Sequence, residues 1–313
     1  MNRRDLLTSV PVAAAGLLTG AYRPAAAGTA DGVKRVRKLE AFGLQLSTVT
    51  PLLMADFEGT LAQVAALGYR QVEFSALGFL GRPVSYVAEM LDRLGMAAPV
   101  GRVSPKLPEN FSTLDRAAQM QAFRVYAGPQ HLLDNVRHAL KAAQALGQRQ
   151  MVLPLLMAEN FASVAQLQRS AALLREAGEL CAAAGVQFGY HNHDWEFRSV
   201  DGVVPYDYLL ENVSADLLAF QLDVYWMVKA GVDPEAYLKA YPQRFPTCHL
   251  KDIDADGDFA DVGDGRINFP SFVAAAMAAG TRYYFVERDN PPRPIETAQR
   301  GYAYLQQMTY EAL

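Results

Sequence analysis

Imidazole and carboxylate side chains recur at the ends of short apolar segments along this chain. The sequence holds five histidines among 313 residues, and three of them stand at such ends. The residues concerned are Glu73, His191, His193, Asp223, His249, Lys251 and Glu287. A single strand-end carboxylate can simply cap a helix, but recurrence on consecutive segments favours a shared site. Imidazole and carboxylate without thiolate suit one divalent ion, either Mn, Mg, Co or Zn, with one position open for substrate oxygens.

The apolar segments have the length and composition of β-strands, and stretches rich in Ala and Leu at helical spacing lie between them. We expect eight strands, at residues 42–47, 69–74, 97–103, 150–154, 186–191, 218–223, 247–251 and 283–287. The expected helices include 57–67, 132–146, 163–184, 234–240, 270–279 and 297–308. A glycine that can form a left-handed helix cap precedes several strands: Gly68, Gly95, Gly147, Gly185 and Gly280.

Strand alternating with helix predicts a parallel sheet, and eight such units predict an α/β fold of the (β/α)8 TIM-barrel class. The absence of a glycine-rich dinucleotide motif after the first strand argues against a Rossmann fold. The active site of a TIM barrel lies at the carboxyl ends of its strands, which is where the candidate residues fall. Alternation along a strand predicts which side chains share the inner face: Gln221 with Asp223, His249 with Lys251, Phe285 with Glu287, and His191 with His193. Cys248 is expected to face outward, and His131 and His138 to lie at the surface.

Longer motifs surround these residues between positions 42 and 305. They are Gly43-Leu44-Gln45-Leu46, Gly68-Tyr69-Arg70-Gln71-Val72-Glu73-Phe74, Tyr190-His191-Asn192-His193 with Glu196-Phe197, Gln221-Leu222-Asp223-Val224-Tyr225-Trp226, His249-Leu250-Lys251-Asp252, Val262-Gly263-Asp264-Gly265 and Phe285-Val286-Glu287. Together they resemble the sugar phosphate isomerase/epimerase family of xylose-isomerase-like TIM barrels.

The resemblance implies one divalent metal ion, held by carboxylates from strands five, six and eight and by a histidine from strand seven. Asp223, His249 and Glu287 match these positions directly. Strand five departs from the family pattern, because His191 stands where a carboxylate is common. We expect His191 to be the fourth ligand, with His193 or Glu196 as competitors.

The reaction implied is proton abstraction next to a sugar carbonyl, through an enediolate. Glu287 or His193 is the expected base, and Lys251 is expected to stabilise the oxyanion or donate a proton. Return of the proton gives isomerisation or epimerisation. Loss of a β-substituent instead gives a lyase or hydratase acting on 3-keto-glycosides. A non-catalytic sugar-binding protein of the periplasm is a further alternative, because a fold does not fix a function.

The expected substrate is a small carbohydrate, and four residues near the strand ends are expected to contact it: Glu73, Glu196, Trp226 and Asp252. Trp226 could form an apolar platform for a sugar face together with Tyr225 and Trp195, or these rings could fill gaps at the barrel rim.

Charge argues against nucleic acid as a partner. The chain carries 29 basic and 33 acidic residues, a net charge of −4, and no Lys/Arg-rich run that would neutralise phosphates. A DNA-repair endonuclease of the same superfamily is disfavoured for this reason, and because a trinuclear zinc cluster needs more histidines. Two cysteines are too few for a disulfide scaffold.

The first residues have the composition of an export signal. Arg3 and Arg4 precede a short apolar run, and Ala25 to Ala27 provide small residues for cleavage. We therefore expect a twin-arginine signal peptide at 1–27, a linker at 28–38 and one catalytic domain at 39–313. The mature protein would be periplasmic or otherwise exported, with no membrane contact after cleavage. Because sugar phosphates are scarce outside the cytoplasm, a non-phosphorylated keto sugar is favoured as substrate.

Overall fold

An eight-stranded parallel sheet forms the centre of the structure, a computed structural model that describes residues 36–312. The strands follow one another in the order β3-β2-β11-β8-β7-β6-β5-β4. Their bounds are β2 (Gly43–Gln45), β3 (Gln71–Glu73), β4 (Val100–Arg102), β5 (Gln150–Leu153), β6 (Gln187–His191), β7 (Ala219–Asp223), β8 (Thr247–Leu250) and β11 (Tyr283–Val286). Each of the eight expected strands is present, and each is shorter than predicted. The predicted signal peptide lies outside the described residues.

The sheet closes on itself at a narrow seam between its first and last strands. Gln71 of β3 forms an isolated parallel bridge with Ala97, which precedes β4. Two backbone hydrogen bonds of 2.9 Å support that bridge, from the Val72 amide to the Ala97 carbonyl and from the Ala97 amide to the Arg70 carbonyl. Because pairing stops there, the carboxyl ends of β3 and β4 are not joined by a ladder. The fold is the predicted barrel, with one weakly paired seam.

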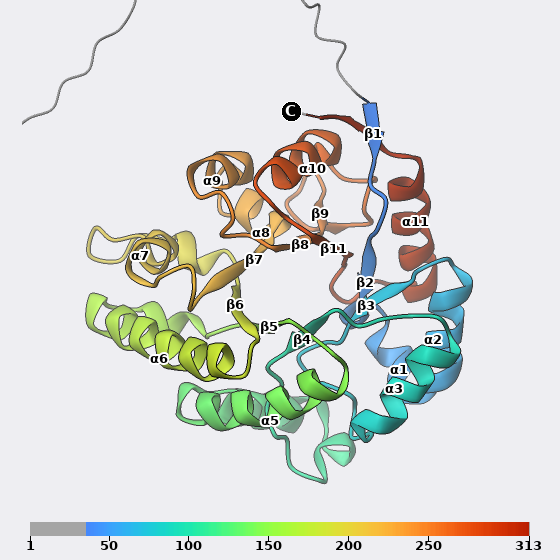
Figure 1. Ribbon diagram of the computed structural model, residues 1–313, viewed down its shortest axis with the longest axis horizontal. Helices are drawn as coiled ribbons and strands as arrows, with labels where there is room; N and C mark the ends of the chain where they lie inside the picture. Colours follow the sequence, from blue (N-terminus) through green and yellow to red (C-terminus); the bar gives the residue numbers. More distant parts are fainter. Residues whose placement is uncertain (1–35, 313) are drawn as a thin grey trace, which may run out of the picture. The chain divides into compact units, whose positions relative to one another are not determined.

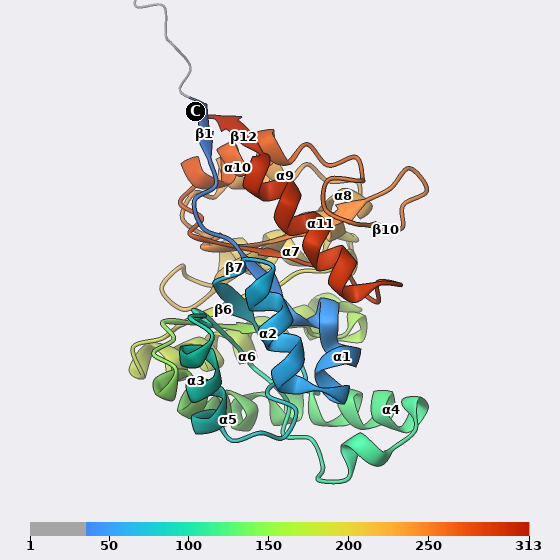
Figure 2. The ribbon, with the colours of Figure 1, turned by 90° about the vertical axis from the view of Figure 1, so that its right-hand side faces the viewer.

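Helices surround the strands (Figure 1). Those that follow the prediction are α2 (Phe57–Ala66), α5 (Leu132–Ala145), α6 (Val164–Ala183), α9 (Pro234–Ala240), α10 (Phe269–Ala278) and α11 (Pro294–Gln307). The structure adds α1 (Thr50–Ala55), α3 (Val84–Arg93), α4 (Arg116–Tyr126), α7 (Pro205–Asn212) and α8 (Val224–Lys229). The α4 helix lies at the periphery (Figure 2), and none of its residues is buried.

Two apolar layers hold these elements together. The larger one fills the space between the strands and the helices, and it includes Cys248, which faces outward as predicted. The smaller one fills the barrel interior with Val100, Val152 and Phe285. The Phe285 ring leaves no room for a side chain at position 43 of the neighbouring strand, because a Cβ there would lie 2.6 Å from its Cδ1. Gly43 is therefore required by the inner packing.

Helix termination also follows the sequence. Gly147 ends the turn after α5 with φ +65°, and Gly185 does the same after α6 with φ +70°. These left-handed values favour glycine because it lacks a Cβ. The chain thereby reverses directly into β5 and β6, whose carboxyl ends contribute to the site described below.

The ends of the described chain pair with each other. Strand β1 (Val36–Lys38) is antiparallel to β12 (Thr309–Glu311). The last three residues of the predicted 28–38 linker therefore belong to the folded unit, because their backbone groups bond to the C-terminal strand. Of the other surface predictions, His138 is exposed and His131 is partly buried. Among the described helices, none combines the length and the hydrophobicity needed to cross a bilayer.

Candidate active site

Parallel strands bring distant polar residues to one end of the barrel. His191 and Asp223 close β6 and β7, and Glu287 directly follows β11. His249 lies in β8, and Lys251 comes immediately after that strand. All five side chains are almost completely buried. Because the register pairs Asp223 with His249 and His191 with Gln221, neighbouring strands present these groups to a common point inside the barrel mouth.

Three of the predicted metal ligands form a compact donor set. One ligand atom from each of His191, Asp223 and His249 lies within 4.8 Å of the others. The Oδ2 atom of Asp223 is 3.6 Å from His191 Nε2 and 4.0 Å from His249 Nδ1. This oxygen is buried, and Lys251 Nζ lies 3.1 Å from it. Two imidazoles and a buried carboxylate that converge on one point form a donor set that fits a divalent cation.

Two carboxylates flank the His249 ring. Nδ1 lies 2.7 Å from Glu287 Oε2, and Nε2 lies 2.6 Å from Glu73 Oε2. Burial alone would lower the pKa of His249, but the charges of Glu287 and Glu73 raise it to about 9. Glu73 thus contacts a predicted ligand, as carboxylates that orient metal-binding histidines do, whereas we had expected it to bind substrate.

Lys251 lies among three carboxylates. Its Nζ is 2.8 Å from Glu287 Oε2, 3.0 Å from Asp289 Oδ2 and 3.1 Å from Asp223 Oδ2. Burial would lower the pKa of this amine, but Asp223 and Glu287 raise it well above its usual value. Lys251 is therefore a permanent cation that neutralises part of the buried negative charge.

Two of the three carboxylates beside Lys251, Asp223 and Glu287, differ in their ionisation. Burial raises the pKa of Asp223 to about 6, because the nearby Lys251 charge offsets only part of the desolvation. Burial would also raise the pKa of Glu287, but Lys251 and His249 hold it well below its usual range. Ser47 donates a hydrogen bond of 2.5 Å to the other oxygen, Glu287 Oε1. Glu287 is the more firmly ionised and the better oriented of the two.

Two glutamine amides and one arginine hold the carboxylate and imidazole groups of the cluster through hydrogen bonds. Gln221 donates from Nε2 to Glu73 Oε1 at 2.8 Å, and its Oε1 lies 3.0 Å from His191 Nδ1. Gln45 donates to Glu73 Oε2, and Arg102 donates to Gln221 Oε1, both at 2.5 Å. Sequence reasoning had assigned no role to Gln45, Ser47 or Arg102. The signal available was their polarity at the ends of the first and third strands, in positions where a purely structural strand would be apolar.

His193 lies beside the donor set without contacting the carboxylates directly. Its ring is 5.2 Å from the His191 ring, stacks on Trp195 at 4.3 Å, and lies 5.2 Å from Trp226. Burial, together with the charge of Lys251, lowers the pKa of His193 to about 3, so the ring is neutral. His193 Nδ1 and Trp226 Nε1 are buried and lack hydrogen-bond partners among the described residues.

The remaining predicted residues support loops. Glu196 accepts hydrogen bonds from the Tyr190 hydroxyl at 2.5 Å and the His193 amide at 2.9 Å, and burial raises its pKa to about 8. Both carboxylate oxygens of Asp252 accept backbone amides, from Ile253, Gly263, Gly265 and Ile267. The structure therefore places Glu196 beneath His193, and Asp252 inside the turn that contains Gly263 and Gly265.

Comparison with protein families supports the fold. The family model described as a xylose isomerase-like TIM barrel matches residues 61–308. The sequence is 27% identical over 156 residues to an inosose dehydratase of Clostridium botulinum (strain Alaska E43 / Type E3). That match covers 43% of this chain and 52% of the relative, so the chain spans about half the length of the curated relatives it matches.

Two solved structures extend the comparison. A sugar phosphate isomerase/epimerase from Parabacteroides distasonis ATCC 8503 has 26% identity and a TM-score of 0.68, covering 85% of this chain and 93% of that one. A structure described as the IOLI protein with a bound zinc atom has 14% identity and a TM-score of 0.61, covering 84% of this chain and 96% of that one. The second shows a shared fold.

Proposed function

The chain belongs to the xylose isomerase-like TIM barrel family, and from this premise we propose that it is a divalent-metal-dependent sugar isomerase or epimerase. In the proposed reaction it removes a proton next to the carbonyl of a non-phosphorylated keto sugar. The observation that carries the proposal is the buried donor set of His191, Asp223 and His249, with Glu287 and Lys251 in contact with it. Relatives named inosose dehydratase and sugar phosphate isomerase/epimerase support a small carbohydrate as the substrate.

We propose that Asp223, His249, His191 and Glu287 hold the ion. The fit rests on the convergence of ligand atoms from His191, Asp223 and His249 within 4.8 Å, and on a donor chemistry of imidazole and carboxylate that suits Mn, Mg, Co or Zn. A divalent ion in such a site polarises a carbonyl and makes the adjacent C–H more acidic.

Glu287 is assigned to proton transfer and Lys251 to charge stabilisation. Glu287 is ionised, and Ser47 fixes its Oε1 from one side, so it can accept the proton from the carbon next to the carbonyl. Lys251 carries a firmly held proton and positive charge, which stabilise negative charge developing on the substrate oxygen. Return of the proton to the neighbouring carbon gives isomerisation, and its return on the opposite face gives epimerisation.

His193 is better suited to binding than to general base catalysis. A pKa of about 3 makes its ring a weak base. The unpartnered His193 Nδ1 and Trp226 Nε1 belong to one aromatic wall that also contains Trp195. This arrangement supports sugar hydroxyl recognition combined with stacking on a sugar face.

A lyase is the second candidate, favoured by the match to inosose dehydratases. The same proton abstraction by Glu287 would then be followed by loss of a β-substituent, and the proton that Glu287 has accepted can pass to that leaving group. The two candidates share every residue named above and diverge only in the fate of the enediolate. A 3-keto-glycoside is the substrate class for which both remain open.

Proton exchange tests the proposal without requiring that the final product be known. The metal-loaded protein should exchange the hydrogen next to the carbonyl of keto sugars and 3-keto-glycosides for deuterium in heavy water, followed by NMR. Metal analysis should show about one ion per chain. Binding of a sugar without exchange or product would favour the non-catalytic alternative. Product formed with complete retention of the hydrogen would point to a hydride shift instead.

We also propose that the chain is exported by the twin-arginine route. The basis is Arg3 and Arg4 before the apolar run and the small residues up to Ala27. Replacing both arginines with lysine should leave uncleaved precursor in the cytoplasm, detected by fractionation and mass spectrometry. Unchanged periplasmic accumulation of the double variant would refute this route.

A further inference from the structure

A cavity of about 610 Å³ opens beside the barrel mouth, at the seam between β3 and β4. The segment 77–83 after β3 forms one wall, and the segment 104–108 after β4 forms another. Helix α5 closes the outer side with His138 and Ala139. The seam is where strand pairing ends, so the cavity occupies the space that a continuous ladder between β3 and β4 would close.

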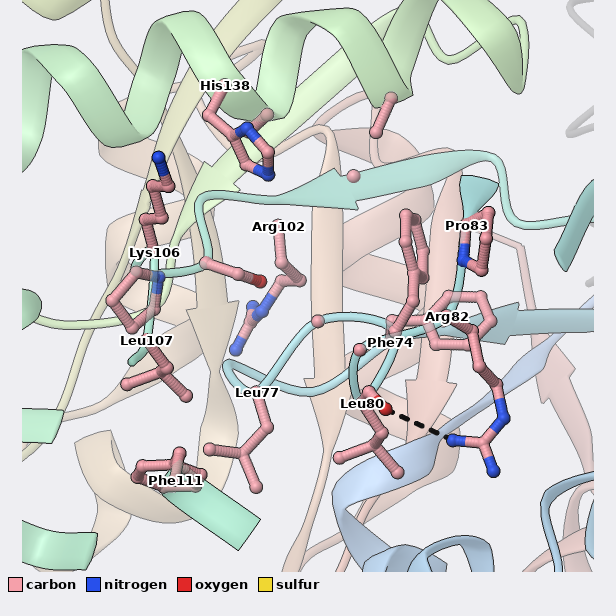
Figure 3. Close-up of a pocket in the computed structure, with 18 of the residues that line it drawn as sticks. Phe74, Leu77, Leu80, Arg82, Pro83, Arg102, Lys106, Leu107, Phe111 and His138 are labelled. Atoms are coloured by element: carbon pink, nitrogen blue, oxygen red, sulfur yellow. Dashed lines mark hydrogen bonds between the residues drawn. The ribbon is translucent and has the colours of Figure 1, made fainter. Parts of the chain in front are cut away.

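The lining is mostly apolar. Figure 3 shows Leu77, Leu107 and Phe111 on one side, and Phe74, Leu80 and Pro83 on the other, with Arg102 between them. Lys106 and Arg82 stand farther out, and Glu109 is the single acidic residue of the lining. The volume lies within the range of about 300–1,000 Å³ that is usual for small-ligand pockets. The cavity therefore suits an apolar or aromatic group of limited size.

Arg102 joins this cavity to the candidate active site. Its side chain is only 7% exposed, and its Nη1 donates to Gln221 and lies 3.6 Å from Glu73 Oε2. Gln221 in turn contacts the His191 ring. The buried Nε of Arg102 has no hydrogen-bond partner among the described residues. A single side chain thus borders both spaces and retains one unused donor.

The wall formed by residues 77–83 is held in an unusual backbone conformation. Leu80 has φ +53° and lies between Gly78 and Gly81, which have φ +64° and +80°. A branched residue in the left-handed region is strained. The Leu80 side chain lines the cavity, so this strained position contributes directly to its apolar surface.

We propose that this cavity binds an apolar, preferably aromatic, aglycone of a keto-glycoside whose sugar ring lies at the barrel mouth. The inference rests on the proposed function and narrows its substrate class from a free sugar to a glycoside. The sugar carbonyl lies at the donor set, and the aglycone crosses Arg102 into the space between Leu77, Leu80 and Leu107. Arg102 Nε is placed to donate to the glycosidic oxygen or to a ring hydroxyl.

Paired ligands that differ only in the aglycone test the proposal. The binding arm compares phenyl β-D-glucoside with methyl β-D-glucoside by ligand-observed NMR titration, which needs no turnover. The kinetic arm compares the corresponding 3-keto compounds. Burial of one phenyl ring is expected to give wild-type protein at least ~10-fold tighter binding of the phenyl ligand, and a similarly lower KM.

Leu107→Asp and, separately, Leu77→Asp place a charge in the cavity and should remove the phenyl preference while leaving the methyl ligand unchanged. Met120→Asp is the matched control, since Met120 lies on α4 outside the lining and is 61% exposed. Circular dichroism identifies any variant that is not folded. If one of the two cavity variants is unfolded, the other is compared with the wild-type protein.

The outcomes separate this inference from the proposed function. Equal binding of the two ligands by wild-type protein, or a phenyl preference that survives in a folded cavity variant, overturns the aglycone site. A phenyl preference without turnover of either keto compound supports the cavity and counts against the proposed function. Asp223→Asn should abolish turnover of both keto compounds and keep the phenyl preference.

Discussion

The two sides of the barrel mouth differ in chemical character: one is charged and the other is apolar. On the side of β6, β7, β8 and β11, buried charged groups contact one another, and nearly every polar atom has a partner within the cluster. On the side of β3 and β4, the strands separate after a single bridge, and apolar side chains surround an open cavity. Arg102 and Glu73 form the boundary between them.

The difference indicates that the two sides have different functions. A charged cluster held by mutual contacts keeps its geometry, which proton abstraction and metal binding require. An apolar cavity bounded by loops offers surface without directional bonds, which suits recognition of a substituent. Changes on the polar side should therefore affect every substrate, whereas changes on the seam side should affect only substrates that enter the cavity. The predictions below test the polar side of this contrast, in order of decreasing effect.

The largest effect is expected from Asp223→Asn. The amide removes the negative charge at the centre of the donor set, so metal content and activity should fall together. Loss of several kcal/mol of transition-state stabilisation corresponds to a decrease of about 10³-fold or more in kcat. Elemental analysis and turnover measure the two quantities. Asp216→Asn at an exposed position is the control, and full metal occupancy in Asp223→Asn would place the site elsewhere.

Glu287→Gln should abolish deuterium exchange while leaving some metal bound. The amide keeps one oxygen near the donor set but cannot accept a proton, and loss of a general base costs about 10²–10⁴-fold. Exchange in heavy water measured by NMR gives the result. Glu296→Gln, on the exposed first turn of α11, is the matched control. Wild-type exchange rates in Glu287→Gln would transfer the base role to another residue.

Lys251→Met should slow turnover without emptying the metal site. Loss of a charged donor to a developing oxyanion costs roughly 10²–10³-fold in kcat. The ammonium also neutralises Asp223 and Glu287. Removal of the metal should therefore lower the unfolding temperature of Lys251→Met by more than it lowers that of the wild-type protein. Thermal unfolding with and without metal measures this difference in unfolding temperature, and Lys239→Met is the control. An unchanged kcat would remove Lys251 from the reaction.

The smallest effect concerns stability and pH at Glu196. Burial raises its pKa from 4.5 to about 8, so the folded protein keeps a proton that the unfolded chain releases. Stability should therefore fall as pH rises from about 4.5 to 8, by up to a few kcal/mol. Glu196→Gln should flatten this slope in urea unfolding measured at pH 5 and pH 8. Glu159→Gln, at an exposed position, should keep the wild-type slope.

Much of the molecule follows from the sequence alone. Apolar runs and glycine-terminated helices specify eight strands and the helices between them, because these patterns are local and repeat with regular spacing. Parity along each strand then places Gln221, His249 and Phe285 inside the barrel and Cys248 outside. The predicted donors His191, Asp223 and His249 meet for the same reason: a parallel barrel brings all strand ends to one edge.

Only the tertiary structure decided which polar residues share a contact. Asp252 and Glu196 resemble the site residues in type and position, but their oxygens accept hydrogen bonds within nearby loops. Ser47 reaches Glu287 across 240 positions in the chain, and Arg102 reaches Gln221 across 119. The seam between β3 and β4, and the cavity beside it, depend on where backbone pairing stops. Local sequence patterns specify elements, whereas these contacts depend on the packing of all eight strands at once.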